Sequence, residues 1–197
     1  IRGEIGTEIK LLIYRKEWDK PKEIKITRAS ITVPTLKWEM KPGNIAYFKL
    51  SSFNAQANRL FYEASLEALL KGVSGVVLDL RNNPGGFLDV AVDFGGWFLK
   101  RGDVVVMERF KNEADKTFRA NGNQAWSQIP MVILINGGTA SASEILAGAI
   151  ADNRGIKLIG EKTFGKGSVQ TLKELSDGST IKVTVAKWLL PSGKTID

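Results

Sequence analysis

The chain has 197 residues, 43% of them hydrophobic, which is enough for one well-packed domain with a small appendage and too few for two full-sized domains. Its 28 basic and 21 acidic residues give a net charge of +7, but like charges are not grouped in blocks, which argues against a nucleic-acid or anionic-membrane partner. The chain has no histidine and no cysteine, so by itself it cannot build a Ser-His-Asp triad, a Cys-His pair, a disulfide or a zinc site with histidine or thiolate ligands. We therefore predict no metal and no other cofactor.

The first part of the chain predicts short strands and one helix. Alternating apolar and polar residues predict strands over 8–14, 23–27 and 45–50. Apolar residues then recur at helical spacing over 54–70, and Gly72 is a plausible stop. No apolar stretch reaches about 18 residues, so no transmembrane segment is predicted.

After Gly75 the strands become continuous apolar runs, each followed by a turn and often by a helical pattern. The predicted strands cover 76–80, 104–107, 131–135 and 156–159, and the predicted helices cover 88–99 and 140–150. Such runs predict parallel strands covered on both faces, and 131–159 predicts a βαβ unit. The chain end alternates around an Asp-Gly turn, which predicts a hairpin over 168–175 and 180–190. The fold class is therefore α/β with a mixed sheet.

Ser141 lies in Gly-Gly-Thr-Ala-Ser-Ala-Ser-Glu, at the start of the predicted helix over 140–150. Backbone N–H groups in a first helical turn lack partners inside the helix, so such a serine is well placed to be a nucleophile. Serine and threonine before a helix are, however, most often N-caps. We interpret Thr139 and Ser143 in that way, and for Ser141 alone the cap and the nucleophile stay open as alternatives.

Lys166 lies in Thr-Phe-Gly-Lys-Gly-Ser-Val-Gln, 25 positions after Ser141. A lysine can deprotonate a serine only if its pKa falls well below the usual value of about 10.4, and burial among apolar groups lowers it. Phe164 beside Lys166, with a glycine on each side of the lysine, predicts such a desolvated site. The alternatives are a solvated turn or a phosphate-binding loop, and the second fails because Gly167 stands where Ser or Thr is required.

Taken together, these motifs resemble the C-terminal processing peptidases, or tail-specific proteases, a family of Ser-Lys hydrolases. The motifs that carry the resemblance are Leu-Asp-Leu-Arg-Asn-Asn-Pro-Gly-Gly at 78–86, Thr-Ala-Ser-Ala-Ser-Glu at 139–144 and Gly-Glu-Lys-Thr-Phe-Gly-Lys-Gly at 160–167. The resemblance implies a ClpP/crotonase-like core over 26–197, with a mixed sheet, parallel βα units and a C-terminal hairpin. It also implies that residues 1–25 are the end of a PDZ domain.

The resemblance further implies roles for single residues. Ser141 matches the nucleophile, Lys166 the general base and Gln170 a residue that orients the lysine. Gln170 lies four positions after Lys166, so we expect the backbone to bend between them, at Gly167, or long side chains to reach across.

Four more residues complete the predicted site. Ala142 matches one N–H donor of the oxyanion hole, and the Gly85–Gly86 turn at the carboxyl end of a parallel strand matches the other. Asp152 falls where some members of the family carry a functionally important aspartate; its alternative interpretation is a polar residue that ends the helix.

The resemblance implies an extracytoplasmic serine endopeptidase that cleaves proteins near unstructured apolar C-termini. Its expected partner is a protein or peptide with such a tail, and a homo-oligomer is a further expectation. The rival hypothesis is a peptide-binding or scaffolding protein with the same fold and little turnover. A third hypothesis, nucleic-acid binding driven by the +7 charge, is disfavoured by the mixed charge pattern.

Overall fold

A computed structural model describes residues 1–197 and divides them into two compact units, Ile1–Val33 and Pro34–Asp197. The first unit is an antiparallel hairpin of β1 (Glu8–Ile13) and β2 (Lys22–Thr27). The predicted boundary between residues 25 and 26 therefore falls inside β2. Arg28 belongs to the first unit, because its guanidinium donates to the Ile1 carbonyl and its backbone N–H to the Thr7 carbonyl. That this unit is the end of a PDZ domain stays a prediction.

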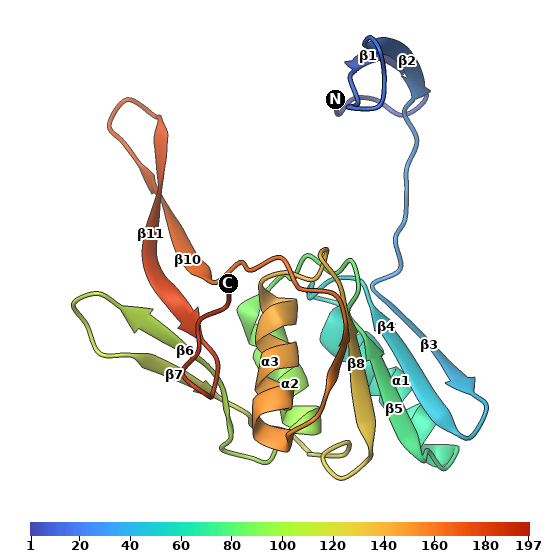
Figure 1. Cartoon of the computed structure of the whole chain (residues 1–197), viewed down its shortest axis with the longest axis vertical. Helices are drawn as coiled ribbons and strands as arrows, with labels where there is room; N and C mark the ends of the chain where they lie inside the picture. The colour runs from blue at the N-terminus through green and yellow to red at the C-terminus, as the bar shows by residue number, and fades with distance from the viewer. The chain divides into compact units, whose positions relative to one another are not determined.

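The second unit is built on a five-stranded sheet with the order β3-β4-β5-β8-β9 (Figure 1). β3 is antiparallel to β4, and the other neighbours are parallel, so the sheet is mixed as predicted. The predicted βαβ unit is present, with β8 and β9 parallel neighbours. The strands are β3 (Leu36–Lys41), β4 (Ile45–Leu50), β5 (Gly75–Asp79), β8 (Met131–Ile135) and β9 (Leu158–Gly160).

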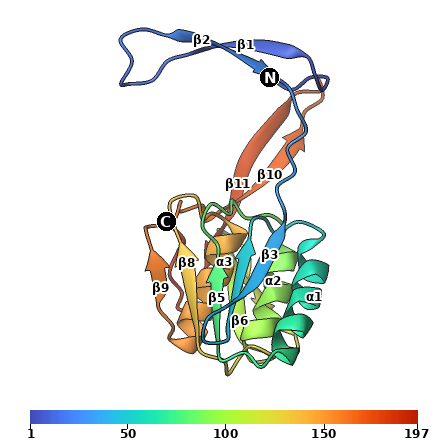
Figure 2. The same cartoon turned by 90° about the vertical axis from the view of Figure 1, so that its right-hand side faces the viewer.

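Three helices cover one face of this sheet: α1 (Ala57–Leu70), α2 (Leu88–Phe98) and α3 (Ala142–Arg154) (Figure 2). They pack on a core in which Phe61 contacts the rings of both Phe48 and Phe94. None of the three combines the length and apolar character needed to cross a bilayer.

The opposite face of the five-stranded sheet carries no helix (Figure 2). Val77, Val132 and Leu134 lie on it and are only half-buried, whereas their neighbours Leu78 and Ile133 point to the helices and are fully buried. The prediction that both faces are covered is therefore wrong for this chain, because all three helices pack on the same side.

A second sheet of four antiparallel strands has the order β10-β11-β6-β7. Its strands are β6 (Val104–Phe110), β7 (Lys116–Arg119), β10 (Ser168–Glu174) and β11 (Thr180–Leu189). The predicted C-terminal hairpin is β10 and β11. The strand over 104–107, grouped in sequence with the parallel strands, instead pairs antiparallel with β7 and β11. An apolar run predicts a strand, but it does not predict which strand pairs with it.

Candidate active site

Two loops meet at the carboxyl edge of the five-stranded sheet, one after β5 and one after β8. Parallel neighbours end at the same edge, so the chain brings them together. The Asn83 carbonyl accepts hydrogen bonds from the Ala140 N–H and the Ser143 hydroxyl, both at 3.0 Å. The Thr139 hydroxyl donates to the Leu80 carbonyl at 2.8 Å. Thr139 and Ser143 therefore join the loops, and their interpretation as helix caps is wrong.

Ser141 stands at the turn from the β8 loop into α3, as the N-cap residue, with φ 57° and ψ −120°. A residue with a Cβ avoids this region, and holding it there costs roughly 1–3 kcal/mol. Gly85 packs against the turn so closely that a Cβ on it would lie 2.9 Å from the Ser141 Cβ. A strained, half-buried serine is thus held against the Gly85–Gly86 turn.

The three predicted oxyanion donors differ in their availability. The Gly85 N–H already donates to the Asn83 side-chain oxygen at 2.9 Å. The N–H groups of Gly86 and Ala142 make no hydrogen bond within the chain. Gly86 is held by its neighbours instead, since the Gly85 carbonyl accepts from the Phe53 N–H. The structure thus leaves two of the three donors free.

Glu144 connects the serine loop to the lysine loop. Its carboxylate is almost fully buried and accepts from the N–H groups of Ser141 at 2.7 Å and Lys166 at 2.9 Å through Oε2, and of Gly165 at 2.6 Å through Oε1. Because Oε2 is shared, the Ser141 and Lys166 nitrogens are no farther apart than the sum of 2.7 and 2.9 Å, which is 5.6 Å. Sequence analysis gave Glu144 no role, although the Ser-x-x-Glu spacing of a capping box was a signal for it.

The side chains of the lysine loop are less buried than predicted. Lys166 is exposed, and Phe164, expected to shield it, is 68% exposed. The prediction of a desolvated lysine is therefore wrong for the free chain. The loop is held by its backbone, through Glu144 and through the Phe164 N–H on the Thr139 carbonyl, which leaves the side chains in solvent.

The bend that was expected at Gly167 lies one residue earlier, at Lys166. The Gly167 N–H donates to the Gly165 carbonyl at 3.2 Å, so a tight turn is centred on Lys166 itself. Gln170 follows on β10 as an exposed residue, next to an irregularity in the strand register between Val169 and Gln170. No hydrogen bond joins the Gln170 side chain to Lys166.

Asp152 does not join these loops. Its carboxylate accepts from the Ser192 N–H at 3.0 Å and so fastens the Pro191–Gly193 turn to α3. Nor does the helix end there, or at residue 150 as predicted: it continues to Arg154 and stops at Gly155, which has the left-handed conformation of a helix C-terminus.

A buried charge shapes the turn after β5. Asp79 has a fully buried side chain that accepts from the Arg81 guanidinium at 2.9 and 2.7 Å, from the Arg81 N–H and from the Tyr47 hydroxyl. Burial raises the pKa of the Asp79 carboxyl, but the hydrogen bonds from Arg81 and Tyr47 outweigh it and hold the pKa below its ordinary value. Burial and the bond to Asp79 raise the pKa of Tyr47. This ion pair fixes the conformation of the first residues of the loop that carries Gly85 and Gly86.

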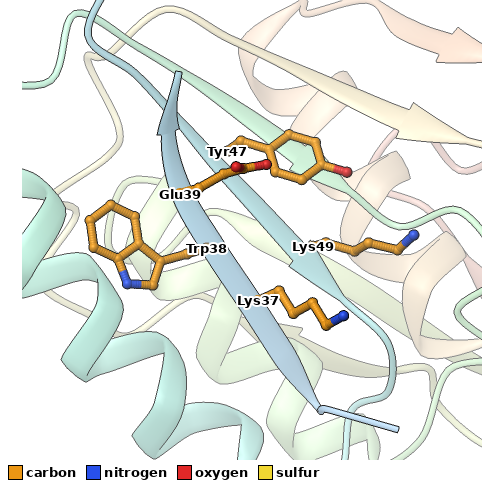
Figure 3. A pocket seen from close by; sticks show the side chains of 5 residues that line it. All are labelled: Lys37, Trp38, Glu39, Tyr47 and Lys49. Atoms are coloured by element: carbon orange, nitrogen blue, oxygen red, sulfur yellow. The ribbon is translucent and has the colours of Figure 1, made fainter. Parts of the chain in front are cut away.

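A cavity of about 510 Å³ lies on the helix-free side of β3 and β4 and not at these loops. Figure 3 shows Lys37, Lys49 and Tyr47 on that side, with Trp38 pointing the other way. None of its lining residues is a predicted site residue. No group of acidic side chains in the chain is arranged to hold a metal ion.

Residues 44–197, which include both loops, match the family model described as Peptidase family S41. The chain belongs to peptidase family S41. It is 40% identical over 196 residues to the "Carboxy-terminal processing protease CtpA" of Bacillus subtilis, which covers all of this chain and 42% of that protein. It is 41% identical to the "Carboxyl-terminal-processing protease" of Synechocystis, over 97% of this chain and 45% of that protein. The chain thus spans less than half the length of these S41 relatives.

Solved structures agree with this S41 assignment. A "photosystem II D1 C-terminal processing protease" superposes with a TM-score of 0.85 at 33% identity, over 99% of this chain and 54% of that one. An S41 protease structure from Bacteroides fragilis has a TM-score of 0.69 at 20% identity, which speaks for the fold alone. The predicted α/β fold of a C-terminal processing peptidase is confirmed.

Proposed function

We propose that this chain is the catalytic part of a serine endopeptidase in which Ser141 is the nucleophile and Lys166 the general base. The observation that carries the proposal is the Glu144 carboxylate, which holds the backbones of both residues within 5.6 Å, the sum of its 2.7 and 2.9 Å contacts. The strained conformation of Ser141 supports it, because such strain at a strand-to-helix turn is typical of an exposed nucleophile.

In the proposed reaction, the neutral Lys166 amine takes the proton of the Ser141 hydroxyl as Oγ attacks the substrate carbonyl. The free N–H groups of Ala142 and Gly86 donate to the oxyanion, and Gly85 supports the turn through its bond to Asn83. Lys166 then gives the proton to the departing amine. Water, deprotonated by the same lysine, attacks the acyl-enzyme, releases the new carboxyl end and restores Ser141.

Because Lys166 is exposed in the free chain, the substrate itself has a part in preparing it. A peptide lying over the loop removes the ammonium group from water and thereby favours the neutral amine. Gln170 orients the amine in this bound state. On this proposal, Lys166 acts as a base in the free chain and becomes a better one beneath a bound substrate.

We propose proteins with unstructured apolar C-terminal tails as substrates, and an extracytoplasmic location. The names of the S41 relatives support cleavage near C-termini. Asp152, tied to the 191–193 turn, acts as a support for α3 and takes no part in the reaction.

The test is cleavage of a peptide with an apolar tail, followed by mass spectrometry. Ser141→Ala and Lys166→Ala should each abolish cleavage, and Lys162→Ala, an exposed lysine of the same loop, should retain it. Undiminished cleavage by either of the first two variants would refute the dyad.

The exposure of Lys166 favours one rival, a peptide-binding protein with little turnover. That rival predicts peptide binding without products and no labelling of Ser141 by a fluorophosphonate.

A further inference from the structure

The β10–β11 hairpin leaves one edge of the four-stranded sheet without a partner. The order β10-β11-β6-β7 puts β10 at the end of the sheet, so the outward backbone groups of Ser168–Glu174 pair with no other strand. A free edge of this kind is a template for adding an extended chain. Figure 1 shows the hairpin extending beyond the helices, with β10 on its side nearer α3.

This edge begins beside the proposed dyad. β10 starts at Ser168, two residues after Lys166, and the Lys166 backbone is bound through Glu144 to that of Ser141. A strand lying along β10 therefore runs directly to the two loops. It would also cover Lys166, which favours the neutral amine of the proposed reaction.

The side chains of β10 suit an apolar partner. Leu172 is 68% exposed, and it lies on the same face of the strand as Gln170, since alternate residues share a face. The nearest charges of β10, Lys173 and Glu174, have opposite signs. Along β10 itself, an added strand thus meets an apolar side chain and two charges that cancel; Lys182 lies opposite Leu172, on β11.

The same hairpin has a second free edge, on β11. Only Ala186–Leu189 of β11 pair with β6, so the outer edge of Thr180–Val185 is also unpaired. This edge leads to Arg109 and Phe110 at the end of β6, where a cavity of about 330 Å³ opens, and not to the loops of Ser141 and Lys166. The two edges are thus distinguished by where they lead.

We propose that the substrate polypeptide binds as an additional strand on the free edge of β10, with apolar side chains at alternating positions and one of them on Leu172. This inference deepens the proposed function and rests on it for the identity of the bound chain. The backbone hydrogen bonds provide affinity that does not depend on sequence, and Leu172 provides the preference for apolar residues.

The first test replaces single amides of an apolar-tailed peptide by esters and measures the dissociation constant for the Ser141→Ala variant, so that no turnover is needed. Only every second residue of an added strand bonds to the edge, so the constant should rise about 2- to 10-fold at alternate positions and little between them. A rise without alternation, or no binding, overturns the inference.

Alternation without any cleavage by the unmodified chain leaves the inference standing and refutes the proposed function. Cleavage by the unmodified chain without alternation supports the proposed function and overturns the inference.

The second test distinguishes the two edges with matched variants. Leu172→Asp should weaken binding of the apolar peptide at least about 5-fold, because a charge replaces an apolar contact. Ile181→Asp, at a residue of β11 that is 47% exposed, should change it less than about 2-fold. The opposite ranking would move the peptide to the β11 edge and overturn the proposal. Thermal unfolding of both variants checks that the hairpin and core are intact.

Discussion

Replacing Glu144 by Gln tests whether its carboxylate holds the serine and lysine loops together. The carboxylate accepts three backbone N–H groups, those of Ser141, Gly165 and Lys166. An amide of the same shape offers one oxygen and one NH2 group. In its better orientation it keeps the two bonds at Oε2 and turns its NH2 toward the Gly165 N–H; in the other it loses two bonds.

The expected cost follows from that count. One buried donor without an acceptor costs about 1–3 kcal/mol, and the two remaining bonds lose the strength that the charge gave them. A loss of about 2 kcal/mol, if it falls on the docking of the lysine loop, lowers kcat/KM about 30-fold. Glu161→Gln, an exposed glutamate of the same segment, is the matched control and should leave kcat/KM within about 2-fold.

Amide hydrogen exchange measures the same effect without activity. The amides of Gly165 and Lys166 should lose protection in Glu144→Gln and keep it in Glu161→Gln, while the exchange of the β8 amides is unchanged. Unchanged protection of residues 165–166, or cleavage equal to that of the Glu161→Gln control, would refute the role given to Glu144.

Three further predictions concern the surroundings of the site. Because the pKa of Asp79 is held below its ordinary value, its ion pair stabilises the fold above about pH 4, and this contribution is lost as the pH falls through the lowered pKa. In Asp79→Asn, the free energy of unfolding measured by denaturant titration should therefore fall by about 1 kcal/mol less between neutral and acid pH. Gly86→Ala should lower the free energy of unfolding by at least about 2 kcal/mol and lower kcat/KM, because its Cβ would strike the Phe53 carbonyl. Gly102→Ala, at a position with a positive φ but open space, should lower the free energy of unfolding less, and equal losses would contradict this. Asp152→Ala loses one exposed hydrogen bond, so unfolding should shift by less than about 1 kcal/mol and cleavage should persist; loss of cleavage by a folded variant would give Asp152 a catalytic role.

Local sequence patterns predicted most of the strands and helices, and they failed where the partner of a segment decides its structure. β7 has a single apolar residue, Phe118, and forms a strand only because β6 pairs with it. β3 is not predicted, although Leu36, Trp38 and Met40 alternate with charged residues, because Pro34 and Pro42 flank it and proline is typical of turns.

The sequence patterns indicate which loops form the proposed site, but not the environment of their side chains. The spacing of the glycines and of Ser141 in their motifs indicates the two loops. The burial of Lys166 was inferred from its neighbour Phe164, whose side chain lies in solvent. In a loop, the residues next to a side chain in sequence do not determine whether that side chain is buried. The Ser-x-x-Glu spacing indicates the bond between Glu144 and Ser141, but no local pattern contains the bond to Gly165, 21 residues away in sequence.

The most direct measurement of the dyad is the rate at which a fluorophosphonate modifies Ser141, with the modified peptide identified by mass spectrometry. Modification needs the serine to lose its proton, so it reports the base without a substrate of known sequence. The account predicts modification at Ser141 in the unaltered chain and in Lys162→Ala, and a rate at least about 100-fold lower in Lys166→Ala. Modification of Lys166→Ala at the rate of the unaltered chain, or modification of another serine in place of Ser141, would contradict it.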